Sequence, residues 1–199
     1  MNSYEYQKWA LTKDRPTYQD LINRLQLSGQ FQKLLHATFG IAGESGEIAS
    51  AIKEAVFSGT DLDVKNVKEE VGDIFWYIAL GLDAIGSSIC ELSQNLPPFT
   101  TRYSRHSTLI YAALGIADMS GSIVDTAKKA IFYGKELNVV KYKEQNKEML
   151  GFLMVLLNCI ESSFEEVMQM NHDKLEKRFP GGYTDKLAQE RRDKKEGEK

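Results

Sequence analysis

The chain has few of the residues that interrupt helices or cross-link small folds. Its 199 residues include four prolines and two cysteines. Long stretches therefore run without a helix breaker, and the isolated pair Cys90 and Cys159 does not indicate a disulfide framework. The net charge is −3, which gives no positive field of the kind that nonspecific nucleic-acid binding needs. Binding to a nucleic-acid polymer is therefore not expected.

Neither a targeting segment nor a membrane-spanning segment is expected. Residues 1–14 are polar and do not contain the apolar stretch of a signal peptide. The apolar run 74–85 is too short to span a bilayer and carries Asp83. We expect a cytoplasmic protein without a membrane partner, and a homo-oligomer stays open.

The chain does show helical periodicity, because apolar residues recur at three- and four-residue steps and strand-like alternation is scarce. We predict an all-α fold with a connection at 95–105, where Pro97 and Pro98 fall. The charge-dense segment 185–199 is expected to be a mobile tail, which leaves 1–184 as a single domain. The predicted helices cover about 4–12, 17–27, 30–57, 64–93, 106–133 and 139–177, the last broken near Ser162.

The sequence repeats itself at a separation of 75 positions. At this shift Gly40-Ile41-Ala42 matches Gly115-Ile116-Ala117, and the register then continues without a gap. The two copies cover about 31–94 and 106–169. Because a helical hairpin cannot bury its apolar face alone, we predict a helical bundle in which two tandem hairpin repeats pack as a pseudo-dimer.

Four acidic residues of the first repeat have a spacing that suits metal binding. Glu44 and Glu47 lie three positions apart, as do Glu70 and Asp73, so each pair occupies one face of its helix. A short turn between antiparallel helices should bring Glu44 opposite Asp73 and Glu47 opposite Glu70, as adjacent rungs. Such a cluster repels itself unless a hard divalent cation neutralises it. We predict that the four carboxylates bind Mg²⁺, with Mn²⁺ as an alternative, and two ions about 4 Å apart would fit.

Glutamate pairs at this spacing are also common on solvated helix faces, where they only add solubility. Two features favour the metal interpretation. Asp73 opens the apolar run 74–82, where a carboxylate is rarely solvated. In addition, no Lys or Arg falls on the stripe of its own helix, at positions 66, 70, 73 and 77, to pair with it.

Longer stretches around these acids carry a resemblance to a known family. HATFGIAGESGEI at 36–48, KEEVGDIFWYIAL at 68–80 and NHDKLEKRFPGGY at 171–183 resemble MazG-like proteins of the all-α nucleoside triphosphate pyrophosphohydrolase superfamily. Its relatives include dimeric dUTPases and dCTP pyrophosphatases, and the resemblance extends from residue 4 to about 183. It implies magnesium-dependent hydrolysis of a (deoxy)nucleoside triphosphate to monophosphate and pyrophosphate. The implied catalytic residues are Glu44, Glu47, Glu70 and Asp73.

The second repeat departs from this pattern. Its equivalent positions hold Met119, Ser122, Gln145 and Glu148, so one acid of four is kept and no metal cluster is expected there. We therefore expect one active site per chain, with the second repeat packing against the first and walling its pocket.

Further candidates are expected to bind the small-molecule nucleotide. In related enzymes an aromatic residue one turn beyond the last acid contacts the nucleotide, although a plain core position is the alternative. Three polar residues near the C-terminal end share one helix face that would suit phosphates or, alternatively, solvent. Trp76 is expected in the core because it points away from the acid stripe. The substrate-binding candidates are Tyr77, Asn171, Lys174 and Arg178.

Two other functions stay open at this point: a non-catalytic nucleotide- or protein-binding helical bundle, and a structural subunit. The sequence pattern does not select a base or a sugar, and it does not distinguish triphosphates from diphosphates as substrates.

Overall fold

The computed structural model describes residues 2–14, 17–94, 96 and 103–190, and these residues form helices and no strand. The predicted all-α class is confirmed. The helices are α1 (Ser3–Leu11), α2 (Gln19–Leu27), α3 (Gly29–Ser58), α4 (Val64–Asp83), α5 (Ile89–Ser93), α6 (Arg105–Ile131), α7 (Val139–Cys159), α8 (Phe164–Arg178) and α9 (Asp185–Glu190).

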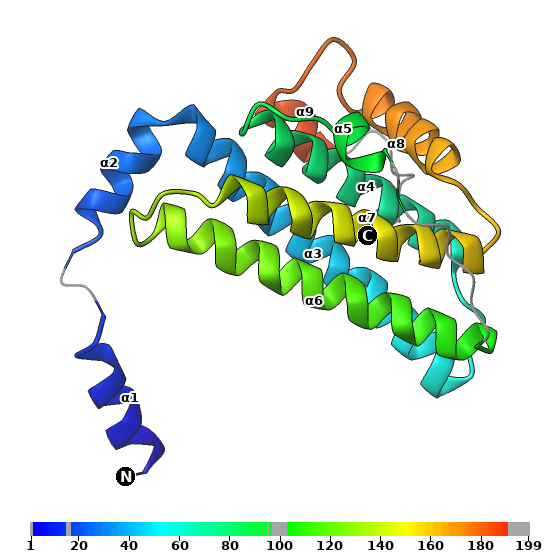
Figure 1. The fold of residues 1–199 in the computed structure, drawn as a ribbon, viewed down its shortest axis with the longest axis horizontal. Helices are drawn as coiled ribbons and strands as arrows, with labels where there is room; N and C mark the ends of the chain where they lie inside the picture. Colours follow the sequence, from blue (N-terminus) through cyan, green and yellow to red (C-terminus); the bar gives the residue numbers. More distant parts are fainter. Residues whose placement is uncertain (1, 15–16, 95, 97–102, 191–199) are drawn as a thin grey trace.

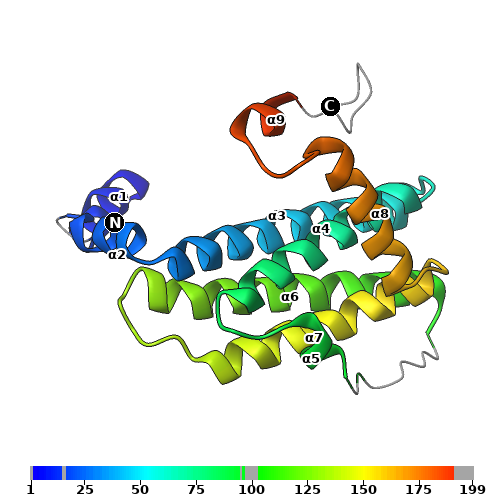
Figure 2. The same ribbon diagram turned by 90° about the horizontal axis from the view of Figure 1, so that it is seen from above.

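Four long helices form the body of the molecule. α3 and α4 make one hairpin, α6 and α7 make a second, and the two hairpins meet mainly through α3 and α6 (Figure 1). Figure 2 shows the two hairpins as two layers, with α8 lying across α4. The hydrophobic core between them is built of fully buried side chains, among them Leu34, Ile41, Ile48, Ile74, Ile78, Ile116, Ile123, Met149 and Leu153.

The turns of the two hairpins share a left-handed glycine and a side-chain helix cap. α3 is followed by Gly59 with φ 72°, and Gly134 follows α6 with φ 66°. Both values lie in the left-handed region that glycine adopts without strain. The next helix is then capped by a side-chain oxygen, Asp63 accepting from the backbone N–H of Asn66 and Asn138 from that of Lys141.

Contacts inside each hairpin also repeat at the same separation. A Cβ atom at Gly40 would overlap the ring of Tyr77, and a Cβ atom at Gly115 would overlap the ring of Phe152. Both glycines therefore let an aromatic side chain of the neighbouring helix lie directly on the backbone of α3 or α6. The repeat thus holds in three-dimensional contacts as well as in sequence letters.

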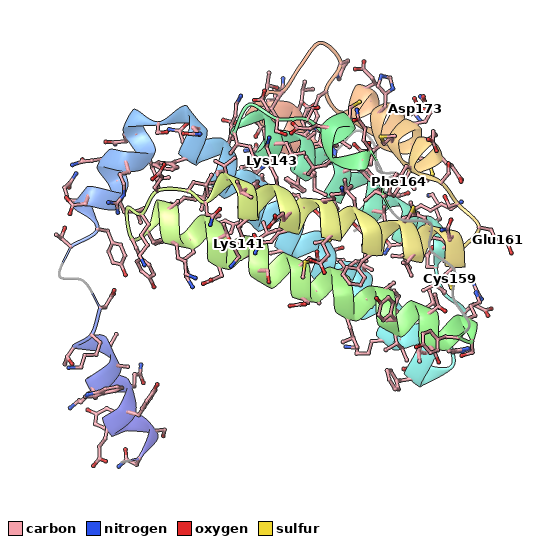
Figure 3. The ribbon with its side chains drawn as sticks, viewed as in Figure 1. Lys141, Lys143, Cys159, Glu161, Phe164 and Asp173 are labelled. Carbon is pink, nitrogen blue, oxygen red and sulfur yellow. The ribbon has the colours of Figure 1, made fainter. Side chains whose placement is uncertain are left out.

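Two ion pairs join each hairpin to the helix that follows the other hairpin. Lys68 on α4 pairs with Glu166 on α8 at 2.6 Å, and Lys143 on α7, labelled in Figure 3, pairs with Glu91 on α5 at 2.9 Å. Each lysine and each glutamate stands 75 positions from its counterpart. Such reciprocity is what a pseudo-twofold axis predicts. The pseudo-dimer itself stays a prediction.

Of the helix breaks in the structure, the one near Ser162 was predicted from the sequence and the one at Gly86 was not. The break near Ser162 is found, because α7 ends at Cys159 and α8 starts at Phe164. The single helix expected over 64–93 is wrong: the chain turns at Gly86, where φ is 68°, before Ser88 caps α5. Residues 95 and 97–102 of the predicted connection lie outside the described residues.

The segment expected to be a mobile tail begins as a helix. Residues 185–190 form α9, which contacts α8, and 191–199 lie outside the described residues. By length and composition α6 could cross a membrane, but half of its apolar window is buried inside the protein. A core helix of a soluble protein meets the same criterion, so this is weak evidence for a span.

The contact between Gly40 and Tyr77 predicts opposite effects for two neighbouring glycines of α3. Gly40→Ala should lower the free energy of unfolding by about 1–3 kcal/mol, because the new methyl group displaces the Tyr77 ring. Gly43→Ala, which meets open space, should raise it by about 0.5–1 kcal/mol, since alanine favours the helix. Urea titration measures both, and equal shifts in the two variants would contradict the contact.

Candidate metal and nucleotide site

The predicted acids converge from the first hairpin. One carboxylate oxygen from each of Glu44, Glu47 and Glu70 can be chosen so that all three lie within 4.8 Å of one another. Glu44 and Glu47 come from α3 and Glu70 from α4, where it is 8% exposed. Among the described residues this is the cluster whose spacing would suit a metal ion. Because so little of Glu70 is exposed, little water can solvate its negative charge.

The electrostatics of the cluster follow from this crowding. Burial, with the hydrogen bond that protonated Glu70 donates to Glu44 and repulsion from the neighbouring carboxylates, raises the pKa of Glu70 to about 8. Burial also raises the pKa of Glu44, and the charges of Asp73 and Glu47 add to that, while the hydrogen bond with Glu70 and the charge of Lys174 act in the opposite direction. Glu44 and Glu70 therefore share a proton near neutral pH.

Asp73 is engaged differently from the three glutamates. Its Oδ1 accepts a hydrogen bond of 2.6 Å from Asn171 Nδ2, and Lys174 Nζ lies 2.5 Å from both carboxylate oxygens. Both partners belong to α8. The reasoning that no cation could pair with Asp73 is therefore wrong, because it considered the residues of one helix and the cation arrives from another.

The predicted rungs are also altered. Glu44 was expected opposite Asp73, but its hydrogen-bond partner is Glu70. Asp73 instead bonds α8, while its charge still acts on Glu44 and Glu70. The four acids thus form a triad of glutamates with an adjacent aspartate that is held by a lysine.

The acids border a cavity of about 790 Å³, a size typical of small-molecule sites. Its walls come from α3, α4, α8 and the segment leading to α9. All four predicted acids line it, together with the candidates Tyr77, Lys174 and Arg178. Asn171 is buried, with its Cβ against Gly72 of α4, where an added Cβ would lie 3.0 Å away.

Tyr77 joins the acids to the rest of the cavity. Its half-buried ring lies on Gly40, and burial raises the pKa of the Tyr77 hydroxyl. The negative charges of Glu44 and Asp73 raise it further, while Arg178 acts in the opposite direction. The hydroxyl therefore stays protonated and can donate a hydrogen bond beside the acids.

Two residues of the cavity were missed or misplaced. Trp76 was expected in the core, but it is 40% exposed and lines the cavity next to Tyr77. His36 also lines it. A signal for His36 was present, because it lies eight positions before Glu44 and thus close to the acid face of α3. Trp76 was misjudged because a bulky indole ring reaches beyond the helix face that its Cα occupies.

The second hairpin shows how the equivalent positions pack when three of the four acids are replaced. Met119 is buried, and Gln145 donates a hydrogen bond of 3.0 Å from its Nε2 to the backbone oxygen of Ser122. Glu148 is exposed. Within the part of the chain that the structure describes, no metal-binding cluster is found in this hairpin. The aromatic pair survives, since Tyr111 and Phe152 lie 5.5 Å apart between ring centroids.

Comparison with known proteins assigns no family. No protein-family model matches the chain, and no curated protein or solved structure matches it either. The function is therefore argued from the site.

The raised pKa of Glu70 predicts how stability depends on pH without added metal. Between the ordinary glutamate pKa of 4.5 and about 8, the folded chain holds a proton that the unfolded chain has lost, so stability falls as pH rises through this window. Glu70→Gln should remove most of that slope, measured as the melting temperature from pH 5 to 8. Glu69→Gln, at the half-buried neighbouring position of α4, serves as control, and an unchanged slope in Glu70→Gln would contradict the assignment.

Proposed function

We propose that the chain is a magnesium-dependent nucleotide pyrophosphohydrolase. The observation that carries the proposal is the convergence of three glutamates within 4.8 Å in a cavity that Lys174 and Arg178 also line. Carboxylates that crowd together suit a hard divalent cation, and basic side chains beside them suit phosphate oxygens. The two together are the requirements of a polyphosphate substrate.

The donor set fits magnesium in chemistry. Glu44, Glu47 and Glu70 supply oxygen ligands, and Asp73 is the fourth acid of the same cavity. The shared proton of Glu44 and Glu70 is the one that a cation would release. When bound, magnesium would polarise a phosphate and lower the pKa of an attacking water.

The remaining residues have separate tasks. Lys174 and Arg178 offset negative charge on the phosphates, and the Tyr77 hydroxyl donates a hydrogen bond beside them. A carboxylate of the cluster accepts the proton of the water. The new bond joins the water oxygen to phosphorus, the phosphoanhydride bond breaks, and pyrophosphate leaves with its electron pair. Attack at the α-phosphorus rests on the resemblance of the motifs.

One observation favours a second candidate, a bundle that binds a nucleotide or protein without turnover. Asp73 already has Asn171 and Lys174 as partners, so this acid is satisfied without a metal. The two candidates differ in product formation. Canonical and modified nucleotides incubated with magnesium, with monophosphate and pyrophosphate resolved by chromatography, distinguish turnover from binding alone.

Glu47→Gln is the sharpest test of the acid cluster. Glu47 is exposed and its side chain belongs to the glutamate triad, so the amide should leave the fold intact and weaken the hold on the cation. We expect loss of turnover by at least about 100-fold, in line with the loss of a metal ligand, with an unchanged circular dichroism spectrum.

Glu148→Gln is the matched control, since Glu148 occupies the position equivalent to Asp73 in the second hairpin and is exposed. Its rate should stay within a fewfold of wild type. Near-normal turnover of Glu47→Gln at saturating magnesium would show that the site is assigned wrongly. Binding of two nucleotides per chain would overturn the expectation of a single site.

The ion pair between α8 and α4 gives a second test. Lys174→Ala should lower kcat/KM by at least about tenfold, because the variant loses a cation beside the phosphates. It should also lower the melting temperature without metal, since Asp73 loses its counter-charge. The neighbouring and exposed Lys177→Ala should change neither quantity, and equal effects of both variants would exclude a specific role for Lys174.

A further inference from the structure

The lining of the cavity is of two chemical kinds. It includes the four acids with Lys174 and Arg178, and it also includes a set of aromatic rings. The charged side chains suit a polyphosphate, but such a substrate needs no aromatic wall. The rings therefore require a separate explanation.

The first aromatic wall comes from α3 and α4. The Trp76 ring lies 4.9 Å from the Tyr77 ring and 5.6 Å from the His36 ring, in edge-to-face contacts with interplanar angles of 74°. His36 and Tyr77 are themselves 5.5 Å apart. Each ring is thus held by the other two. Trp76 is nevertheless 40% exposed, so part of its surface is left open at the cavity.

The second aromatic wall comes from the segment after α8. Phe179 and Tyr183 lie 5.2 Å apart between ring centroids, and both line the same cavity. Tyr183 is 67% exposed. The chain between them turns at Gly181 and Gly182, with φ values of 85° and 113° that favour glycine. The chain therefore leaves the direction of α8 here, and the turn lines the same cavity as the rings of α3 and α4.

We propose that these aromatic side chains bind the planar heteroaromatic ring of the nucleotide, with Trp76 as the main stacking surface and Tyr183 contributing from the second wall. This inference rests on the proposed function, and it goes further by assigning the base subsite. Stacking on aromatic side chains accepts every base, because each base has a π-face. The substrate class is therefore base-bearing nucleotides in preference to inorganic polyphosphates of the same charge.

The ring subsite makes a kinetic prediction that a structural role for Trp76 would not. Trp76→Ala should raise KM for a nucleoside triphosphate about tenfold or more, the effect of losing one stacked base. It should leave inhibition by inorganic tripolyphosphate within twofold of wild type, since tripolyphosphate has no ring. Trp76→Phe should recover most of the lost affinity. A variant that misfolds would lose binding of both compounds and would fail the rescue by phenylalanine.

Trp9 offers a matched control and a clean optical signal. It is the other tryptophan of the chain, lies on α1 and is 48% exposed. Trp9→Ala should change neither KM nor inhibition by tripolyphosphate. In Trp9→Phe, Trp76 is the single tryptophan, so its fluorescence reports directly on this wall.

The decisive measurement titrates Trp9→Phe with a non-hydrolysable nucleoside triphosphate in magnesium, and in parallel with tripolyphosphate. We expect saturable quenching by the nucleotide and none by tripolyphosphate. Hydrolysis with an unchanged KM in Trp76→Ala, and equal fluorescence responses to both compounds, would overturn the ring subsite and leave the proposed function standing. Saturable quenching without turnover of any nucleotide would overturn the proposed function and leave the ring subsite standing.

Discussion

Repulsion among three glutamates is the constraint on which the organisation of the site depends. Two helices hold their oxygens within 4.8 Å of one another, and like charges so close cannot all be ionised without a partner. The structure lessens the repulsion in two ways. Glu44 and Glu70 are joined by a hydrogen bond with a shared proton, and Lys174 is placed against Asp73 at the edge of the cluster. Both depend on close helix packing, which buries the acids and brings α8 within reach.

Comparison with the second hairpin distinguishes the residues that the fold requires from those that the site requires. It keeps the left-handed glycine turn, the helix cap and the glycine under an aromatic ring, so these are requirements of the hairpin itself. Gln145 stands where Glu70 does in the first hairpin, and its amide bonds the backbone of Ser122. A neutral side chain therefore satisfies this position. The acidic side chain of Glu70 is not explained by folding, which favours a functional reason for it.

The sequence predicted local features well and contacts between distant segments poorly. Spacing placed Glu44, Glu47 and Glu70 on facing helices, because helical periodicity and a short turn decide this alone. It selected Lys174 as a candidate but could not reveal the ion pair of Lys174 with Asp73, which is 101 positions away and forms only when α8 packs on α4. Trp76 was misplaced because one helix viewed alone does not show which neighbours leave a face open. The break at Gly86 had a readable signal, a glycine followed by a serine cap, which the predicted helix 64–93 left out.

The ion pair at Asp73 also bears on how a metal and a substrate would share the cavity. Lys174 contacts both oxygens of that carboxylate, so a cation that takes Asp73 as a ligand must compete with the ammonium group. A divalent ion brings more charge than the lysine that it displaces, and the displaced ammonium group remains on α8 beside the cavity. Triphosphate carries enough negative charge to hold both cations. Under the proposed function, Lys174 therefore changes its partner from a carboxylate to a phosphate. The metal and the nucleotide then bind cooperatively, because each pairs with a charge that the other would leave unpaired.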